Sequence, residues 1–495
     1  MAKNFTAHLN PIFYPDSVAI VGASNHFNKW GSFVMSHMLS GGYLGKVFPI
    51  NPKEKEIYGR KVYTKIAAVP DKVDLAVITT PVSTVLDVVK QCIEKGVGGM
   101  VVVTSGFSET GQEGKQIERD LVDLVTSAGI PTVGPNTMGV MCTQKKLFAL
   151  GAPLYPRRGD ISFISQSGNL GNQMLEWAEE HSIGMSKFVG SGNEGVIRKD
   201  HYLEYLAGDP DTKVILVYLE GIADGHRFLD VAEQTSVKKP IIALKGGRTE
   251  AGGEAALSHT GSMAGNSAIF TSAFRQTGII EARNPTDMLD YSMALANLPL
   301  PRGNRVGVIT FGGGWGVVTC DAIVEQGMTV ATLGRDVIEK LDKVLPPFWS
   351  RRNPVDLVGQ INPEAFLESV RVVTSSPDVD AVICLGIVGV SNMGIRSFTA
   401  SATAADLDNI EYAVRKARDK LFTIERGFLN EVNDIMNQTH KPVINVSLYA
   451  GGTRERFQSR TGFSEVVYTT PEKAVQSLVA MYRYYLHLKG HGVAE

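Results

Sequence analysis

The chain has 495 residues, too many for one ordinary domain, and such a length is typical of about three domains. Hydrophobic residues make up 43% of the chain and charged residues 20%, as in an ordinary soluble globular protein. The 49 basic and 51 acidic residues nearly cancel, which argues against a nucleic-acid-binding protein and against a membrane-surface protein.

The first segment, to about residue 150, alternates short apolar runs with amphipathic stretches. Strands are expected at residues 17–21, 46–50, 75–80, 99–104 and 130–133, with helices at 84–95 and 114–128. This alternation predicts βαβ units and a parallel sheet. Ligands of such sheets bind beyond the carboxyl ends of the strands, where glycine, proline and small polar residues recur here.

The turn after the first strand, residues 22–31, lacks the GxGxxG pattern of a dinucleotide site. No acidic residue ends the second strand to bind a ribose, and Lys53, shortly after that strand, suits a phosphate instead. The turn therefore argues against NAD. In the alternative interpretation, Ser24 is a helix cap and Lys29 a solvated charge.

The second segment opens with a strand at 159–164, the turn Ser165-Gln166-Ser167-Gly168 and a helix at 172–180. A strand, a turn of small residues and a helix point free backbone N–H groups and the positive helix end at an anion. Serine and glycine are also ordinary capping residues, so the pattern alone leaves both interpretations open.

Two further strands of this segment end in residues that suit catalysis. The strand at 213–219 delivers Glu220 at its carboxyl end, and the strand at 240–244 leads into a loop rich in Gly, Ala and Ser that contains His259. An imidazole can act as a nucleophile, and a carboxylate can orient it. Alternatively, Glu220 caps a helix and His259 is a surface histidine without a special role.

The third segment follows a Pro- and Gly-containing linker at 299–303. Its first strand, at 305–310, precedes the turn 311–316 and a helix at 317–325, a second turn of the anion-binding kind. Later strands are expected at 381–386, 442–446 and 466–470, with a last helix at 471–488. Residues 391–440 predict a polar, charged helical insertion, which covers a neighbouring subunit or forms a solvated helix pair.

Four cysteines, at positions 92, 142, 320 and 384, lie far apart and form no CxxC pair. They predict neither a disulfide framework nor a zinc site, and we expect no metal site in this chain. The N-terminal residues show no signal peptide, and no run reaches the roughly 18 apolar residues that span a bilayer. We therefore expect a cytoplasmic protein with no membrane partner.

Five motifs occur in one order along the chain: SQSG from Ser165, LEG ending in Gly221, ALSHTGSMAG from Ala256, GGGWG from Gly312, and NPVDL from Asn353. In this order the chain resembles the alpha subunit of the ADP-forming (NDP-forming) acyl-CoA synthetases, relatives of succinyl-CoA synthetase, over essentially its whole length. ALSHTGSMAG is the most specific of these motifs. The resemblance implies an α/β fold of three consecutive parallel-sheet domains. These are a Rossmann-like CoA-binding domain at 1–150 and two flavodoxin-like ligase domains at 151–300 and 301–495, the second of which carries the 391–440 insertion.

The resemblance also implies roles for individual residues. His259 matches the phosphorylated histidine, and Glu220 matches the acidic residue that orients it. The phosphate-binding positions are Ser165, Ser167, Gly168, Gly313 and Gly314. The CoA-binding positions are Gly22, Ala23, Ser24, Lys29, Asn51, Lys53, Thr80, Pro81, Thr104, Ser105 and Asn136.

Members of this family interconvert acyl-CoA, phosphate and ADP with the free acid, CoA and ATP, so CoA is expected as a substrate. No ATP-grasp segment is recognisable in this chain, and the resemblance implies that ADP or ATP and Mg²⁺ bind a separate ATP-grasp beta subunit in an α2β2 complex. Residues 196–198 depart from the family pattern, because Val, Ile and Arg stand where acidic residues are expected. Two rival hypotheses are a nicotinamide-dependent oxidoreductase and a non-catalytic CoA-binding regulatory protein of the same fold.

Overall fold

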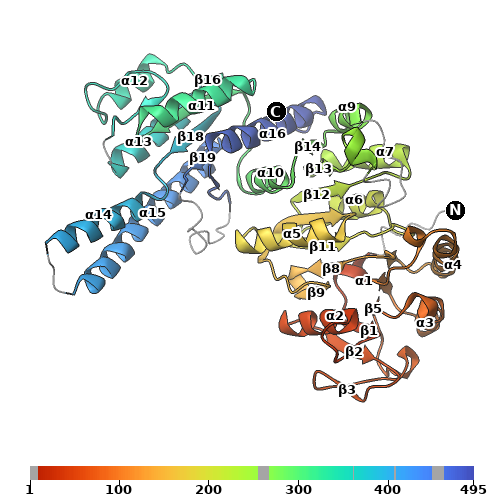
Figure 1. Ribbon diagram of the computed structural model, residues 1–495. Helices are drawn as coiled ribbons and strands as arrows, with labels where there is room; N and C mark the ends of the chain where they lie inside the picture. The colour runs from red at the N-terminus through yellow and green to blue at the C-terminus, as the bar shows by residue number, and fades with distance from the viewer. Residues whose placement is uncertain (1–8, 255–266, 360–361, 406–408, 449–461, 495) are drawn as a thin grey trace. The chain divides into compact units, whose positions relative to one another are not determined.

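The computed structural model describes residues 9–254, 267–359, 362–405, 409–448 and 462–494 (Figure 1). The chain divides into two compact units, residues 1–288 and 289–495. The described residues form two large sheets in the first unit and one in the second, and a small two-stranded sheet pairs β3 (Glu56–Ile57) with β4 (Arg60–Lys61). The predicted α/β class with consecutive parallel sheets is confirmed, whereas the domain boundaries at residues 150 and 300 stay predictions.

The first sheet is entirely parallel and has the order β2-β1-β5-β6-β7. Its strands are β1 (Ser17–Val21), β2 (Lys46–Ile50), β5 (Leu75–Ile78), β6 (Gly99–Val102) and β7 (Thr132–Val133). The helices of this region are α1 (Asn10–Phe13), α2 (Trp30–Ser40), α3 (Val82–Lys95) and α4 (Gln112–Ala128), with short 3₁₀ turns at Ile66–Ala68 and Ser108–Thr110. The order reverses between β1 and β5, and doubly wound sheets bind ligands at such a reversal.

The second sheet has the order β14-β13-β12-β10-β11-β8-β9. Its parallel strands are β10 (Arg158–Ser165), β11 (Met185–Gly190), β12 (Val214–Leu219), β13 (Ile241–Lys245) and β14 (Ile280–Ala282), and the reversal lies between β10 and β12. The antiparallel strands β8 (Gly139–Cys142) and β9 (Leu147–Leu150), joined by a 3₁₀ turn at Thr143–Lys145, extend one edge. No strand was expected in that segment. The helices are α5 (Gly168–Glu180), α6 (Lys199–Gly208), α7 (Gly225–Ser236), α9 (Ser267–Thr277) and α10 (Pro285–Asn297).

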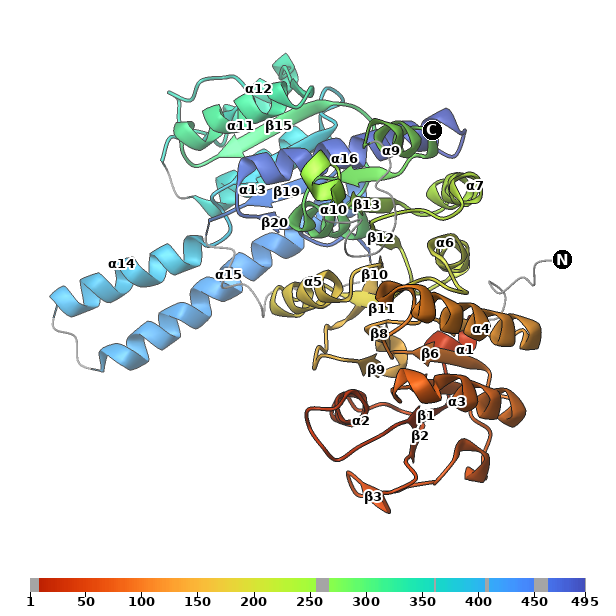
Figure 2. The ribbon, with the colours of Figure 1, turned by 45° about the vertical axis from the view of Figure 1, so that its right-hand side comes forward.

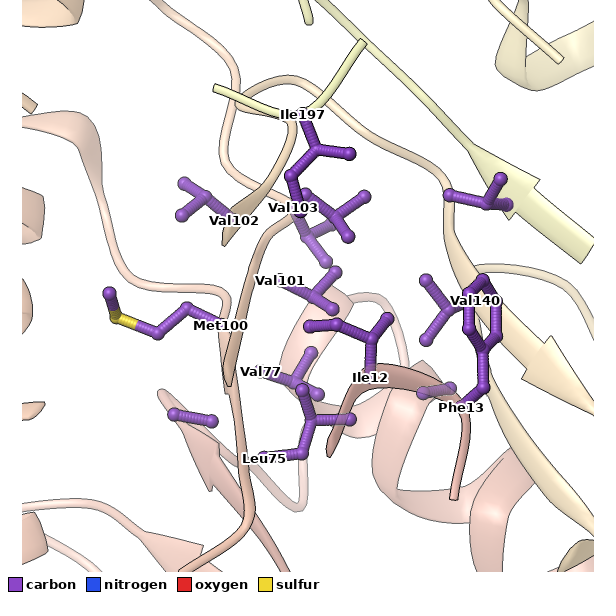
Figure 3. Packing of buried hydrophobic residues seen from close by; sticks show 14 of the residues in the cluster. Ile12, Phe13, Leu75, Val77, Met100, Val101, Val102, Val103, Val140 and Ile197 are labelled. Atoms are coloured by element: carbon purple, nitrogen blue, oxygen red, sulfur yellow. The ribbon is translucent and has the colours of Figure 1, made fainter. Parts of the chain in front are cut away.

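One hydrophobic core joins the two sheets of the first unit. Figure 3 shows Val101 and Val103 beside Ile12 and Phe13 of α1, with Val140 of β8 and Ile197 close by. The family pattern leads us to expect acidic side chains at residues 196–198. In the structure Ile197, one of these residues, is fully buried. The departure from the family pattern therefore serves packing between the two sheets.

A buried ion pair fixes the second sheet at the end remote from Glu220. Lys187 on β11 lies 2.6 Å from Asp209, and their side chains are only 1% and 3% exposed. The Lys187 ammonium also lies 4.8 Å from the centroid of the Tyr14 ring, which is a cation–π contact. Removing one member of such a pair leaves an uncompensated buried charge.

We predict that Lys187→Met lowers the free energy of unfolding by about 3–5 kcal/mol, because Asp209 is left charged and buried. Lys46→Met is the matched control, since Lys46 pairs with Asp71 at the surface of the same unit and exposed pairs contribute little. Denaturant unfolding of the two variants measures the difference. Equal free energies of unfolding in the two variants would show that the buried Lys187–Asp209 pair contributes no more to stability than the exposed Lys46–Asp71 pair.

The third sheet repeats the same order, β16-β15-β18-β19-β20, with β17 paired to β15. The strands are β15 (Arg305–Thr310), β16 (Thr329–Val330), β17 (Val355–Asp356), β18 (Ala381–Leu385), β19 (Val443–Val446) and β20 (Val467–Tyr468). The helices are α11 (Gly313–Glu325), α12 (Arg335–Leu341), α13 (Pro363–Ser375), α14 (Val390–Ala404), α15 (Ile410–Thr439) and α16 (Pro471–Gly490). The reversal of the order lies between β15 and β18.

The described part of the 391–440 segment is mainly helical, as predicted, and forms the pair α14 and α15, which lie side by side in Figures 1 and 2. The two halves of α15 differ. Residues 428–436 bury Phe428, Leu429, Val432, Ile435 and Met436 in the core of the second unit. This half of α15 is therefore the crossover helix between β18 and β19, and the 391–440 segment is only partly an addition to the sheet domain.

Two helices begin four residues earlier than predicted, and both differences fall at glycine-rich turns. α5 begins at Gly168 instead of residue 172, and α11 begins at Gly313 instead of residue 317. Glycine has a low helix propensity, so the sequence pattern places these residues before the helix. In the structure they form the first helical turn, where backbone N–H groups lack intrahelical acceptors. Within the described residues, no helix is both long and apolar enough to cross a bilayer.

Candidate active site

The turn between β10 and α5 is built from its two serines. Ser165 is buried, and its hydroxyl donates to the carbonyl of Ser167 at 2.7 Å. Ser167 is the N-cap of α5, and its Oγ accepts from the N–H of Leu170 at 3.4 Å. These bonds hold the turn, while the N–H groups of the first turn of α5, beginning at Gly168, provide the positive end of the helix. The phosphate-binding role of Ser165, Ser167 and Gly168 stays a prediction.

Glu220 follows β12, across the order reversal from that turn, and is buried. Its Oε1 accepts from the phenol of Tyr218 at 3.2 Å. Burial and the negative charge of Glu220 raise the pKa of Tyr218, so the phenol keeps its proton and remains a donor. The alternative that Glu220 caps the next helix is wrong, because Asp224 caps α7 by accepting from the N–H of Arg227 at 3.1 Å.

Gln166 connects the serine turn to Glu220. Its Oε1 accepts from the backbone N–H of Glu220 at 2.8 Å and from that of Gly221 at 3.3 Å. The sequence motif SQSG contains this residue, but a glutamine between two serines gives no signal of its partner. Gln166 thus ties the backbone of Glu220 and Gly221 to the turn that precedes α5.

Lys245, the last residue of β13, is a second feature that sequence reasoning missed. It is 2% exposed, its ammonium donates to the carbonyl of Gly246, and it lies 4.9 Å from the centroid of the Phe270 ring on α9. Burial lowers the pKa of Lys245, and the negative charge of Glu220 opposes part of that effect. A buried cation therefore lies at the strand end that leads toward His259. His259 itself, with residues 255–266, lies outside the described residues.

The carboxyl ends of the first and second sheets meet at the loop after β11. The side-chain amide of Asn193 donates to the Ser108 hydroxyl at 3.1 Å and to the carboxylates of Glu109 and Glu118 at 2.9 and 2.8 Å. Its carbonyl oxygen accepts from the amide of Asn136, a predicted CoA residue, at 3.2 Å.

The same loop also reaches the serine turn. The N–H of Ser191 donates to the carbonyl of Ser165 at 2.8 Å, two residues before Asn193 in the chain. Hydrogen bonds in this loop therefore lie along a continuous path from the predicted CoA position Asn136 to the serine turn.

The predicted CoA turn after β1 is packed closely against its neighbours. Gly22 has a φ of 94°, and a Cβ there would lie 2.8 Å from Thr79 Oγ1, so only glycine fits. Asn51 donates from Nδ2 to the carbonyl of Ala23 at 2.8 Å, and its Oδ1 accepts from the N–H of Lys53 at 2.8 Å. The end of β2 is thereby tied to the turn after β1.

The alternative role of Ser24 as a helix cap is wrong, since the N-cap of α2 is Lys29. Ser24 is buried, and its Oγ accepts from the N–H of His26 at 3.1 Å within the turn. The side chains of Lys29 and Lys53 are exposed. They are therefore accessible to a ligand, and their contact with phosphate stays a prediction.

The next strand ends carry the remaining predicted CoA residues, Thr80, Pro81, Thr104 and Ser105. Thr104 Oγ1 donates to the carbonyl of Thr80 at 2.7 Å, and Pro81 is the N-cap of α3. Thr80 Oγ1 is buried and has no hydrogen-bond partner among the described residues. A buried hydroxyl without a partner is costly, and a polar ligand at this edge would supply one. This observation fits a bound CoA.

The second unit carries the turn with Gly313 and Gly314. Both glycines are exposed and lie in the first turn of α11, whose N-cap Gly312 has no side chain to cap the helix. A Cβ at Gly313 would lie 3.1 Å from Oδ2 of Asp356, so the carboxylate of the NPVDL motif lies close to this helix end. No local sequence pattern indicates this approach. The phosphate-binding role of Gly313 and Gly314 stays a prediction.

Three family models match the chain in succession. The CoA binding domain matches residues 16–143, the succinyl-CoA ligase like flavodoxin domain matches 158–295, and the ligase-CoA domain matches 306–397. The first model covers the whole first sheet and β8, the second covers β10 to β14, and the third covers β16 to β18 and most of β15.

Named relatives and a solved structure agree with these matches. The alpha subunit of ADP-forming acetate–CoA ligase II from Pyrococcus furiosus is 40% identical over 380 residues, which cover 77% of this chain and 82% of the relative. An ADP-forming acetate–CoA ligase from Methanocaldococcus jannaschii is 42% identical over 72% of this chain but only 50% of the relative. The structure of acetyl-coenzyme A synthetase 1 from Ca. Korarchaeum cryptofilum, in complex with phosphate and ADP, superposes with a TM-score of 0.83 at 34% identity. That superposition covers 98% of this chain and 99% of the other.

Proposed function

This chain belongs to the family of ADP-forming acyl-CoA ligases, and we propose that it is the CoA-binding, histidine-bearing alpha subunit of such an enzyme. The reaction converts acyl-CoA, phosphate and ADP into a carboxylic acid, CoA and ATP, and it is reversible. The nucleotide and Mg²⁺ bind a separate ATP-grasp beta subunit, and the complex has two copies of each chain.

The first step is attack of inorganic phosphate on the thioester carbonyl. A carbon–oxygen bond to phosphate forms, the carbon–sulfur bond breaks, and the CoA thiolate takes up a proton. The path from Asn136 through the Asn193 loop to the serine turn supports a shared site for this step, because it connects the predicted CoA strand ends with the N-terminus of α5. A helix N-terminus is suited to phosphate through its free N–H groups and its dipole.

In the second step an imidazole nitrogen of His259 attacks the phosphorus of the acyl phosphate. The carboxylate leaves as the free acid, and a nitrogen–phosphorus bond forms. The role of Glu220 is to orient the imidazole and to stabilise its positive charge, as a carboxylate does for a nucleophilic histidine. Tyr218 donates to this carboxylate, and Gln166 accepts from the backbone N–H of Glu220.

The third step passes the phosphoryl group from His259 to ADP on the partner subunit and regenerates the neutral imidazole. Splitting the transfer keeps the thioester and the nucleotide in separate sites. The N–H groups at Gly313 and Gly314 offer a second positive helix end for the phosphoryl group during transfer.

The buried arrangement of Glu220 carries this proposal. A regulatory protein that only binds CoA has no need for a buried carboxylate that accepts from a phenol, on a residue whose backbone N–H donates to a glutamine of the serine turn. A nicotinamide-dependent oxidoreductase is disfavoured by the first turn, where Gly22 packs against Thr79 and no GxGxxG pattern exists.

Reconstitution tests the proposal. The purified chain alone should form no ATP from acetyl-CoA, phosphate and ADP, and adding an ATP-grasp beta subunit from a two-chain relative, or the one encoded with this chain, should start ATP formation. Size-exclusion chromatography with light scattering should give the mass of two copies of each chain. Steady ATP formation by the isolated chain would contradict the assignment of the nucleotide site to a separate subunit. No ATP formation with any partner would contradict the ligase assignment.

A further inference from the structure

Lys245 is a buried lysine at the carboxyl end of β13, and none of the three proposed steps uses it. The residue is only 2% exposed. Removing an ammonium group from water is costly, so a buried lysine depends on compensating contacts. A buried titratable group next to a candidate active site is itself a candidate for a role in the reaction.

The contacts of Lys245 lead to both ends of the segment that contains His259. The ammonium donates to the carbonyl of Gly246, the first residue after β13. It also lies 4.9 Å from the ring centroid of Phe270 on α9, the helix that follows this segment in the chain. A cation over a ring face is a favourable contact. One side chain therefore contacts the chain just before and just after the segment that contains His259.

Gly246 lies directly against the phenol that donates to Glu220. A Cβ at Gly246 would lie 2.5 Å from the phenol oxygen of Tyr218 and 3.5 Å from Cγ of Glu220, so only glycine fits there. The N–H of Gly246 donates to the carbonyl of Leu219 at 2.9 Å, and its carbonyl accepts from Lys245. Hydrogen bonds on both sides thus hold Gly246 beside Tyr218 and Glu220.

The charges of Lys245 and Glu220 also act on each other. Both groups are buried, and charges interact more strongly where water is excluded. An acyl phosphate is an anion, and an uncompensated carboxylate at the site would repel it. A positive charge beside Glu220 offsets this repulsion.

We propose that Lys245 is a positioning residue of the phosphoryl transfer, which holds Gly246 against Tyr218 and offsets the negative charge of Glu220. The inference rests on the proposed function, in which Glu220 orients His259. Lys245 acts through Glu220 and does not touch the reacting atoms. Its charge, and not only its packing, is therefore required.

The titratable groups on the elements around Lys245 differ in their response to alkaline pH. Tyr218 and Glu220 belong to β12 and its end, and Glu281 lies on β14, where its carboxylate accepts from Thr271 of α9. Burial lowers the pKa of Lys245, and burial raises the pKa of Tyr218. As the pH rises, the ammonium therefore loses its proton earlier than an ordinary lysine does, whereas the phenol keeps its proton.

Lys245→Met removes the charge and keeps an apolar side chain of similar length. Lys239→Met is the matched control, because Lys239 lies just before the other end of β13 and its ammonium donates to the carbonyls of Leu206 and Asp209. We expect Lys245→Met to take label from acetyl-CoA and radiolabelled phosphate at least about tenfold more slowly than the wild type, and Lys239→Met to stay within about twofold. CoA binding to the full-length chain should be unchanged in both variants.

The alkaline pH profile of labelling distinguishes the charge of Lys245 from its packing. In the wild type the rate should fall as the ammonium loses its proton. Lys245→Arg should keep its own neutral-pH rate over the same range, because the guanidinium stays charged. Profiles of the same shape in the wild type and Lys245→Arg would overturn the proposal, and so would equal labelling rates in Lys245→Met and Lys239→Met.

Labelling of the wild type separates this inference from the proposed function. If the wild type takes no label, the ligase assignment fails, and the role of Lys245 fails with it. If the wild type takes label and Lys245→Met takes it at the same rate, only the role of Lys245 fails.

Discussion

Replacing His259 by alanine is expected to reduce ATP formation from acyl-CoA, phosphate and ADP by at least about a thousandfold in the reconstituted complex. The imidazole is the only proposed carrier between the acyl phosphate and the nucleotide, so its loss leaves no route between the two sites. CoA binding by the same variant should be unchanged, because the predicted CoA residues lie on the first sheet. Steady-state ATP formation and CoA calorimetry measure the two effects.

His226→Ala is the control for this substitution. His226 is an exposed histidine in the first turn of α7, with no part in the proposed site, and its loss should leave the rate within about twofold. A His259→Ala enzyme that kept more than a tenth of the wild-type rate would rule out an obligatory phosphohistidine at this position.

Glu220→Gln is expected to lower the rate of phosphoryl transfer by about a hundredfold or more, since loss of the orienting carboxylate beside a catalytic histidine has effects of that order or larger. The change keeps the shape of the side chain, and the amide oxygen can still accept from Tyr218, so the melting temperature should stay nearly constant. Single-turnover labelling with phosphate, followed by transfer to ADP, measures the rate.

Asp224→Asn tests whether the effect is specific to Glu220. Asp224 is a carboxylate four residues further along the chain, and it caps α7. Asparagine caps helices about as well as aspartate, so this change should leave both helix stability and phosphoryl transfer nearly unchanged. Similar losses of rate in both variants would mean that general electrostatics at this edge, and not orientation by Glu220, governs the transfer.

The sequence was most informative where strands are buried on both faces. The strands β1, β2 and β15 have the predicted bounds, because continuous apolar runs ending in glycine or small polar residues are typical of parallel sheets. The position of Glu220 at a strand end also follows from that pattern. Neither the strand bounds nor the position of Glu220 depends on side-chain contacts between distant parts of the chain.

Other features depend on contacts that no local pattern encodes. Gln166 and Lys245 are ordinary residues in sequence, and their importance comes from hydrogen bonds and burial between neighbouring strands. The sequence pattern does not predict the early starts of α5 and α11, because glycine has a low helix propensity. At a helix N-terminus, however, glycine leaves the free backbone N–H groups open to an anion. The sequence predicts all of α15 as part of an insertion, because charged residues are frequent along the helix. The apolar residues that cover the third sheet are interspersed among them and form no continuous run.

Phosphate labelling of the protein tests the central claim most directly. Incubation of the full-length chain with acetyl-CoA and radiolabelled phosphate should give a label that is stable in base, labile in acid and located by peptide mapping at His259. Adding the beta subunit and ADP should move that label quantitatively into ATP. A label that persists in His259→Ala, or that maps to another residue, would contradict the account.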